Sequence, residues 1–101
     1  MEKIVLDLKA IADTNRLKIL SLLLNKQHCV KSLAKKLDIS ESSVSQHLKK
    51  LREAGFVIGE KKGYWVHYSA KNKKLINLSD NLKQLSVYMS SKNGHCCNEK
   101  E

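Results

Sequence analysis

The fold of this chain is decided by the stretch ISESSVSQHLKKLREAG, residues 39–55. Its apolar residues Val44, Leu48 and Leu51 recur at i, i+4 and i+7, so they share one face of a helix. Ser40 comes just before this periodic run and can accept a hydrogen bond from a free amide of the first turn. Gly55 follows the run and can adopt the left-handed conformation that ends a helix. The stretch therefore predicts a capped helix with one buried face.

The opposite face of this helix is polar and carries no bulky apolar side chain. It presents hydroxyl, amide and cationic groups, from Ser42, Ser43, Ser45, Gln46, Lys49 and Arg52. In the major groove of DNA, hydroxyls and amides reach base edges and cations reach phosphates. This face is suited to contact with DNA. On its own, it is equally typical of an ordinary helix whose polar face is solvated.

The segments before this helix complete a helix-turn-helix. Helical periodicity predicts helices over residues 2–12, 15–25 and 30–37, with Asp13 or Thr14 capping the second. The second helix is apolar nearly all round, which favours a place in the middle of the core. Residues 28–30 are predicted to be extended, and residues 38–40 to form the turn into the capped helix. A helix, a three-residue turn and a helix with a polar outer face are typical of DNA-binding proteins.

A hairpin is predicted directly after Gly55. Residues 56–60 and 64–69 are rich in aromatic and β-branched residues, as strands are, and Lys61-Lys62-Gly63 is the expected turn between them. A hairpin after a recognition helix, with lysines at its tip, is the wing of a winged helix. We expect its tip to lie over phosphates or an adjacent minor groove.

The last helix is predicted from a heptad-like spacing of apolar residues. Leu75, Leu78, Leu82, Leu85 and Met89 form one seam over about 18 residues. The seam could cover the chain's own core or meet a second copy, together with the first helix. We favour a dimer, because symmetric reading of two DNA half-sites requires one. We expect a winged-helix domain over residues 1–92 and a Cys-containing tail over residues 93–101.

Length and composition narrow the class of protein. The 101 residues suffice for one domain, and the net charge of +9 favours an anionic partner, nucleic acid before a membrane surface. The few aromatic residues argue against a base-stacking platform for single strands. No apolar run approaches the ~20 residues of a membrane span, and acids interrupt the N-terminus where a signal peptide would be apolar. Three cysteines, an odd number, argue against a disulfide framework, so we expect a cytoplasmic location and no membrane partner.

The expected fold is mainly α with a small β-hairpin, a winged helix-turn-helix in the order α-α-α-α-β-β-α that forms a dimer. Its expected DNA surface combines the recognition helix with the hairpin tip. The residues predicted to lie on it are Ser40, Ser42, Ser43, Ser45, Gln46, His47, Lys49, Lys50, Arg52, Lys61, Lys62 and Tyr64. His47 is either a packing residue or a phosphate contact.

Three segments carry a resemblance to a known family. They are AIADTNRLKIL (residues 10–20), SVSQHLKKLREAGFV (43–57) and KGYWVHY (62–68). Together they make nearly the whole chain resemble the ArsR/SmtB family of winged-helix repressors. The resemblance implies a homodimer on a palindromic operator, released by an inducer that is often a metal or metalloid. It also implies that Ser42, Ser43, Ser45, Gln46 and Lys49 face DNA, whereas Glu41 stands where the family commonly has Gln.

Two metal sites known in the family are not kept in this sequence. The first is a Cys-Val-Cys motif before the recognition helix, and here it is Cys29-Val30-Lys31, with a lysine in place of the second thiolate. The second uses Asp and His early in the last helix and two ligands near its end. The matching positions here hold Asn72, Lys74, Leu85 and Tyr88. We therefore expect neither site to bind zinc or cadmium.

Cys96 and Cys97, with His95 beside them and Cys29 as a distant third thiol, remain as an inducer site. The adjacent pair is similar to the C-terminal cysteine pairs of arsenic-responsive family members, and three thiolates suit the pyramidal coordination of As(III). No cofactor is expected to be required. The alternatives are oxidation of exposed thiols, and a tail whose cysteines have no role while Cys29 is a small buried residue.

Other classes of function predict different behaviour. A winged-helix module for protein interaction would use its basic surface on an acidic partner and would not bind its own promoter. A thiol enzyme or metal carrier would act through residues 95–97, but no nucleophile–base pair is seen elsewhere and a tail offers no pocket that excludes water. We expect a transcriptional repressor that is not an enzyme.

Overall fold

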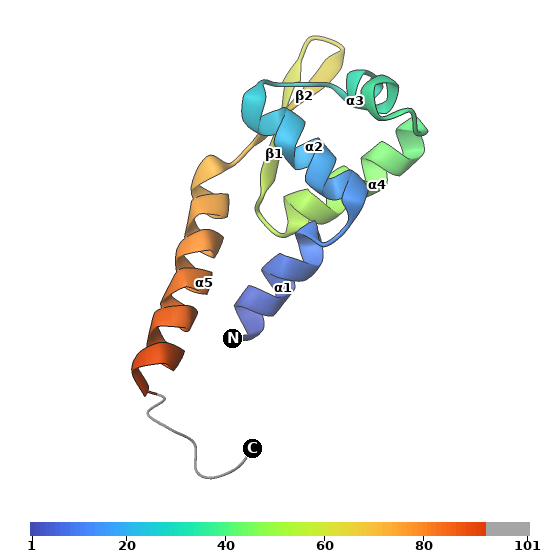
Figure 1. Cartoon of the computed structure of the whole chain (residues 1–101). Coiled ribbons are helices and arrows are strands. Elements are labelled where there is room, and N and C mark those ends of the chain that lie inside the picture. Colours follow the sequence, from blue (N-terminus) through green and yellow to red (C-terminus); the bar gives the residue numbers. More distant parts are fainter. Residues whose placement is uncertain (93–101) are drawn as a thin grey trace.

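The computed structural model describes the backbone of residues 1–92 and the side chains of residues 1–87. It contains α1 (Glu2–Ile11), α2 (Thr14–Asn25), α3 (Val30–Leu37), α4 (Glu41–Glu53), β1 (Val57–Lys62), β2 (Trp65–Ala70) and α5 (Asn72–Lys92). Figure 1 shows α5 beside α1 at one end of the molecule and the hairpin at the other. The predicted order of elements and the winged helix-turn-helix are confirmed. Residues 93–101, with His95, Cys96 and Cys97, lie outside the described residues.

Helix α4 is built as its sequence predicts. The Ser40 hydroxyl accepts a hydrogen bond from the Ser43 backbone N–H at 3.1 Å, and Val44, Leu48 and Leu51 are buried. At the other end Gly55 has a φ of 86°. The N–H of Gly55 donates to the Arg52 carbonyl and that of Phe56 to the Leu51 carbonyl, the paired bonds of a Schellman motif. Both ends of the helix are therefore fixed by local chemistry.

The turn between α3 and α4 uses a residue in the left-handed region. Asp38 has a φ of 57°, and the N–H groups of Asp38 and Ile39 both donate to the Ala34 carbonyl. Aspartate tolerates this conformation better than most residues do. The chain thus reverses within residues 38–40, and α3 packs against α4.

The core lies where α2, α3 and α4 meet the hairpin. Its buried residues are Ile19, Leu20, Leu23, Leu33, Ala34, Val44, Leu48, Leu51, Phe56, Val57 and Leu78. The expectation that α2 is buried all round is wrong. Helix α2 contacts α1, α3, α4 and β2, but Leu17 and Leu24 are 51% and 42% exposed, because these neighbours leave part of its circumference uncovered. Leucine content alone does not distinguish a central helix from one at the edge of a core.

The hairpin turn differs from the predicted one. It consists of Gly63 and Tyr64, so Lys61 and Lys62 belong to β1, and the second strand runs from Trp65 to Ala70. Gly63 has a φ of 66°, as the first position of a type II′ turn requires. The prediction was wrong because the lysines were assigned to the turn by their charge, whereas the glycine sets its position.

Two further contacts hold the hairpin. Gly59 pairs with Tyr68, and a Cβ at Gly59 would lie 2.8 Å from the Tyr68 ring, so only glycine allows this packing. On the other edge of β2, His28 forms a bridge to Tyr68 through two backbone hydrogen bonds. Within the predicted extended piece 28–30, only His28 pairs in this way, since Val30 already begins α3.

Helices α1 and α5 leave apolar side chains exposed. Met1, Val5, Leu6, Leu8, Ile76, Leu82 and Val87 are each more than a third exposed. Leu78 of the predicted seam is buried, while Leu75 and Leu85 are half-buried. Among the described residues, none of the helices combines the length and the hydropathy that crossing a bilayer requires.

Candidate nucleic-acid interface

The outward face of α4 carries most of the predicted DNA-facing residues. The exposed ones are Ser42, Ser45, Gln46, Lys49 and Arg52, and Ser43 is half-buried. Lys50 is also exposed, but it lines a cleft behind α4. The opposite stripe of α4 lies in the core, so the helix cannot turn this face away without breaking its packing. A rigid helix that presents hydroxyl, amide and cationic groups can dock into a major groove.

The serines at the start of α4 form a hydroxyl cluster. Ser40 Oγ lies 3.2 Å from Ser42 Oγ and donates to Ser43 Oγ at 3.1 Å, while it accepts the capping bond. Ser40 therefore serves first to begin the helix. Because Ser40 gives its one hydroxyl hydrogen to Ser43, it is the Ser43 hydroxyl hydrogen that remains for another acceptor at the helix N-terminus, where anionic oxygens are favoured.

His47 is placed differently from its neighbours. Its side chain is 19% exposed, and its Nδ1 lies 3.4 Å from Nη1 of Arg16 and 3.9 Å from Oδ2 of Asp13. Asp13 caps α2 by accepting from the backbone N–H groups of Asn15 and Arg16, and the bond from Arg16 is the main reason that the Asp13 pKa is lowered. The His47 ring thus packs between the recognition helix and the start of α2.

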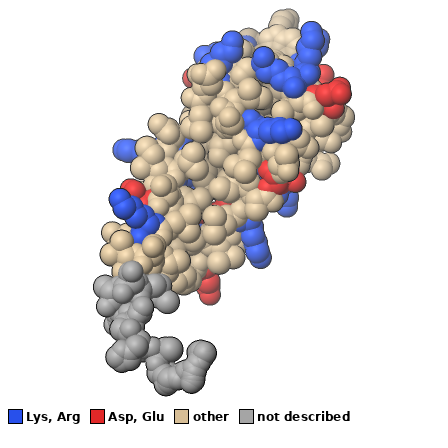
Figure 2. Space-filling model, viewed as in Figure 1, with Lys and Arg blue, Asp and Glu red and all other residues tan. Residues whose placement is uncertain are grey.

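The hairpin brings positive charge to the end of the molecule that lies away from α1 and α5 (Figure 1). Lys61 and Lys62 are exposed in β1, and Tyr64 in the turn is 98% exposed. Lys62 Nζ donates to Oε1 of Gln27, at 3.1 Å, so this lysine is drawn back toward the connection between α2 and α3. Figure 2 shows blue Lys and Arg atoms gathered at this end, where α3 adds exposed Lys31, Lys35 and Lys36.

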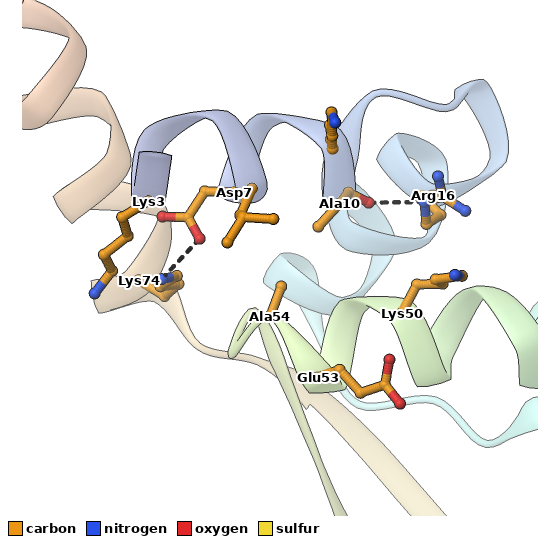
Figure 3. Close-up of a pocket in the computed structure, with 10 residues that line it drawn as sticks. Lys3, Asp7, Ala10, Arg16, Lys50, Glu53, Ala54 and Lys74 are labelled. Carbon is orange, nitrogen blue, oxygen red and sulfur yellow. Dashed lines mark hydrogen bonds and ion pairs between the residues drawn. The ribbon is translucent and has the colours of Figure 1, made fainter. Parts of the chain in front are cut away.

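A cleft of about 600 Å³ lies behind α4, where α1, α2 and α5 meet it (Figure 3). Lys74 of α5 contacts Asp7 of α1 at 3.1 Å, and its Nζ lies 5.5 Å from the centre of the Phe56 ring. Asp7 is 5% exposed, so this ion pair satisfies a buried carboxylate. The pair joins α1 and α5 directly beneath the end of the recognition helix.

Cys29 and His28 lie at the start of α3. Cys29 is the N-cap residue, half-buried, with a free thiol in the described part of the chain. His28 is buried and its Nδ1 lies 3.0 Å from Ser32 Oγ; burial is the main reason that its pKa is lowered, and Lys26 and Lys36 add to it. Within residues 1–87, no three His, Cys, Asp or Glu side chains come together in a way that could hold a metal ion.

Sequence reasoning missed two residues of this region. Neither Asp7 nor Arg16 was assigned a role from the sequence. The sequence does contain a signal for both residues. Each is a charged residue on a helix that is otherwise largely apolar, and a charged group that becomes buried there needs an oppositely charged or hydrogen-bonding partner. The partners Lys74 and His47 lie 67 and 31 residues further along the chain, so the pairs were not visible without the fold.

Several known proteins are similar to this chain in sequence. A model of bacterial regulatory proteins of the arsR family matches residues 13–58. The cadmium resistance transcriptional regulatory protein CadC of Listeria innocua is 38% identical over 73 residues, 71% of this chain and 61% of that protein. This chain therefore spans about three fifths of CadC.

Two further relatives match over most of their length. The arsenical resistance operon repressor of Bacillus subtilis is 32% identical over 91 residues, 88% of this chain and 85% of that protein. The structure of reduced HlyU from Vibrio cholerae superposes with a TM-score of 0.69 at 35% identity, covering 83% of this chain and 88% of that one. Together with the winged helix-turn-helix and its polar recognition helix, these matches show that the chain belongs to the arsR family of bacterial regulatory proteins.

Proposed function

We propose that this chain is a cytoplasmic transcriptional repressor that binds a palindromic DNA operator as a homodimer and leaves it when an inducer binds. The observation that carries the proposal is the outward face of α4. Ser45, Gln46 and Lys49 are exposed on a helix whose ends are capped and whose other face is buried. The net charge of +9 supports an anionic partner.

The homodimer in this proposal rests on α1 and α5. Their exposed apolar side chains leave a surface that water contacts unfavourably and that a second copy would cover. A two-fold pair presents two recognition helices, and a palindrome offers two matching half-sites. Dimerisation and the symmetry of the operator thus belong to one proposal.

The test measures binding to a duplex from the protein's own promoter and to a random duplex of equal length, over a series of salt concentrations. Lys49→Ala should weaken both complexes and reduce the salt slope by about 1.8, because a homodimer loses one phosphate contact in each half-site. Gln46→Ala should reduce the preference for the promoter by about 1–3 kcal/mol. Lys18→Ala, at an exposed lysine of α2, is the matched control and should change neither.

Two results would count against DNA reading. Equal losses on promoter and random DNA for Gln46→Ala contradict base contact by that side chain. If the unmodified protein fails to bind its promoter at physiological salt, its basic surface serves another partner, as in a protein-interaction module.

For the inducer, we propose As(III) or another thiophilic metal ion bound by Cys96, Cys97 and Cys29, with His95 beside the pair. The support is chemical: the described residues hold no complete metal cluster, and Cys29 offers one free thiol. A soft trivalent ion is satisfied by three thiolates. Two relatives carry cadmium and arsenical resistance in their names, which supports the class of inducer.

The inducer test adds As(III), Cd(II), Zn(II) or a mild oxidant to the protein–DNA complex. Release by As(III) that is lost in Cys96→Ser, Cys97→Ser and Cys29→Ser supports the three-thiol site. Release by the oxidant alone would replace the metalloid with a redox signal. If all three variants still leave DNA with the same ion, the cysteines are not the site.

A further inference from the structure

His47 stands on the recognition helix, but its ring contacts protein groups that belong to α2. Its Nδ1 lies 3.4 Å from Nη1 of Arg16, and only 19% of its side chain is exposed. The adjacent residue Gln46 is exposed. The two neighbours therefore have different surroundings, although both were candidates for the DNA surface.

The chemistry of the Arg16 contact decides the state of the ring. A guanidinium group has only donors, so a nitrogen that bonds to it must accept. Nδ1 can accept only when it carries no hydrogen, and a neutral imidazole then carries its hydrogen on Nε2. The contact with Arg16 thus selects a neutral His47 with one tautomer.

Arg16 is itself fixed by two other bonds. Its Nε donates to the Ala10 carbonyl at the end of α1, at 2.7 Å (Figure 3), and its backbone N–H donates to Asp13 Oδ2 at 3.1 Å. The guanidinium is therefore held to α1 through Nε, the backbone of the same residue is fixed at the start of α2, and Nη1 reaches α4. It joins three helices at one point.

We propose that His47 is a positioning residue for DNA binding: its neutral ring accepts from Arg16 and fixes the orientation of α4, and it does not contact phosphate as a cation. The inference rests on the proposed function, in which α4 binds the operator. It assigns to Arg16 the role of tying the recognition helix to α1, one of the two helices with an exposed apolar face.

Protonation of His47 breaks this arrangement. The groups that face Nδ1 are Arg16 and Asp13, and Lys9 and Lys50 line the cleft beside Arg16. A proton on Nδ1 removes the acceptor and sets the imidazolium against the guanidinium, whereas the Asp13 carboxylate at 3.9 Å attracts it. Without that acceptor, α4 loses its hydrogen bond to Arg16.

Two substitutions separate the two roles. A cation that contacts phosphate is kept when lysine replaces His47 and lost when asparagine does. An acceptor for Arg16 is kept with asparagine and lost with lysine. The experiment measures promoter affinity of the three proteins at pH 8 and constant ionic strength, with circular dichroism to verify that the variants fold.

His47→Asn keeps an acceptor near the position of Nδ1, has similar helix propensity, and should bind at pH 8 as the unmodified protein does. His47→Lys supplies a cation without an acceptor and should bind about tenfold more weakly at pH 8, the effect of losing a hydrogen bond to a charged group. Weaker binding by His47→Asn, or tighter binding by His47→Lys, overturns the inference.

Nitrogen-15 NMR of the imidazole in the free protein is independent of DNA. At pH 8, we expect Nδ1 of the unmodified protein to carry no hydrogen. In Arg16→Gln, where the donor is weaker, we expect Nδ1 to carry the hydrogen in part of the molecules. These two results together support the inference. A protonated Nδ1 in the unmodified protein overturns it whatever the DNA result. If the unmodified protein does not bind the promoter, the operator function is overturned instead. Failure of this inference and failure of the proposed function are therefore distinguishable.

Discussion

The two ends of this molecule expose different kinds of side chain. The recognition helix exposes hydroxyl, amide and cationic groups, with its apolar stripe entirely buried. Helices α1 and α5 do the opposite, since Leu6 is 65% exposed and Val87 56% exposed while the carboxylate of Asp7 is buried. Both are surfaces of amphipathic helices, but only one follows the usual rule of apolar residues inside.

The difference indicates what each surface binds. A polar face loses little in water and suits a hydrated, charged partner such as DNA. An apolar face with a buried ion pair beneath it is incomplete until another protein surface covers it. The cleft that contains Asp7 and Lys74 lies between the two.

The largest effect is expected from breaking the apolar side. Leu82→Glu places a charge on α5 and should convert the proposed dimer to a monomer, with a loss of promoter affinity of about 100-fold because the second half-site is no longer engaged. Leu24→Glu is the matched control, since Leu24 on α2 is exposed to a similar extent. Sedimentation measures the first effect and a DNA titration the second. Dimers that persist in both variants would assign the apolar side to another partner.

The next effect concerns the ion pair in the cleft. Asp7→Asn leaves the Lys74 ammonium without its counter-ion in a largely buried position, and should lower the free energy of unfolding by about 2 kcal/mol. Urea unfolding at one fixed protein concentration measures the change. Asp80→Asn, at an exposed position of α5, should leave the free energy nearly unchanged. Equal effects of the two variants would show that the pair contributes only as a surface charge.

A smaller effect is expected where the recognition helix ends. Gly55→Ala forces an alanine into a φ of 86°, at a cost of about 1 kcal/mol, although the added Cβ itself meets only the Lys74 side chain at 3.9 Å. Gly55→Asn should cost less, because asparagine enters the left-handed region more readily. Thermal unfolding ranks the three proteins. If both variants were as stable as the original, the glycine would not be required by its backbone conformation.

The smallest effect is a dependence of stability on pH at His28. Its pKa is lowered in the fold, so as the pH falls through the ordinary histidine value near 6.5 the unfolded chain takes up a proton first. Stability should therefore be complete above that pH and decline toward pH 5.5. His28→Asn keeps an acceptor for Ser32 and should remove this part of the decline. Melting curves from pH 7.5 to 5.5 for both proteins measure it, and parallel declines would place the cause at other groups.

Local signals accounted for most of the fold. The cap at Ser40, the end of α4 at Gly55 and the three-residue turn 38–40 were all predicted, because each depends on residues within one or two turns of the chain. The hairpin turn was misplaced by one to two residues, since charge was weighed above the glycine at position 63. The exposure of Leu17 and Leu24 was missed because periodicity shows that a helix is apolar but not on how many sides it has neighbours.

By itself, then, the sequence determined the kinds and order of the elements and the polar composition of the recognition helix, since those depend on the spacing of residues along one segment. Only the tertiary structure decided which side chains of that helix face outward and which face protein. His47 and Gln46 are neighbours in sequence, and it is the packing of α4 against α2 that brings one ring to Arg16 and leaves the other side chain in solvent. The same holds for Asp7, whose partner Lys74 comes near it only when α1 and α5 lie together. Contacts between distant segments depend on how the whole core packs, and no local pattern records them.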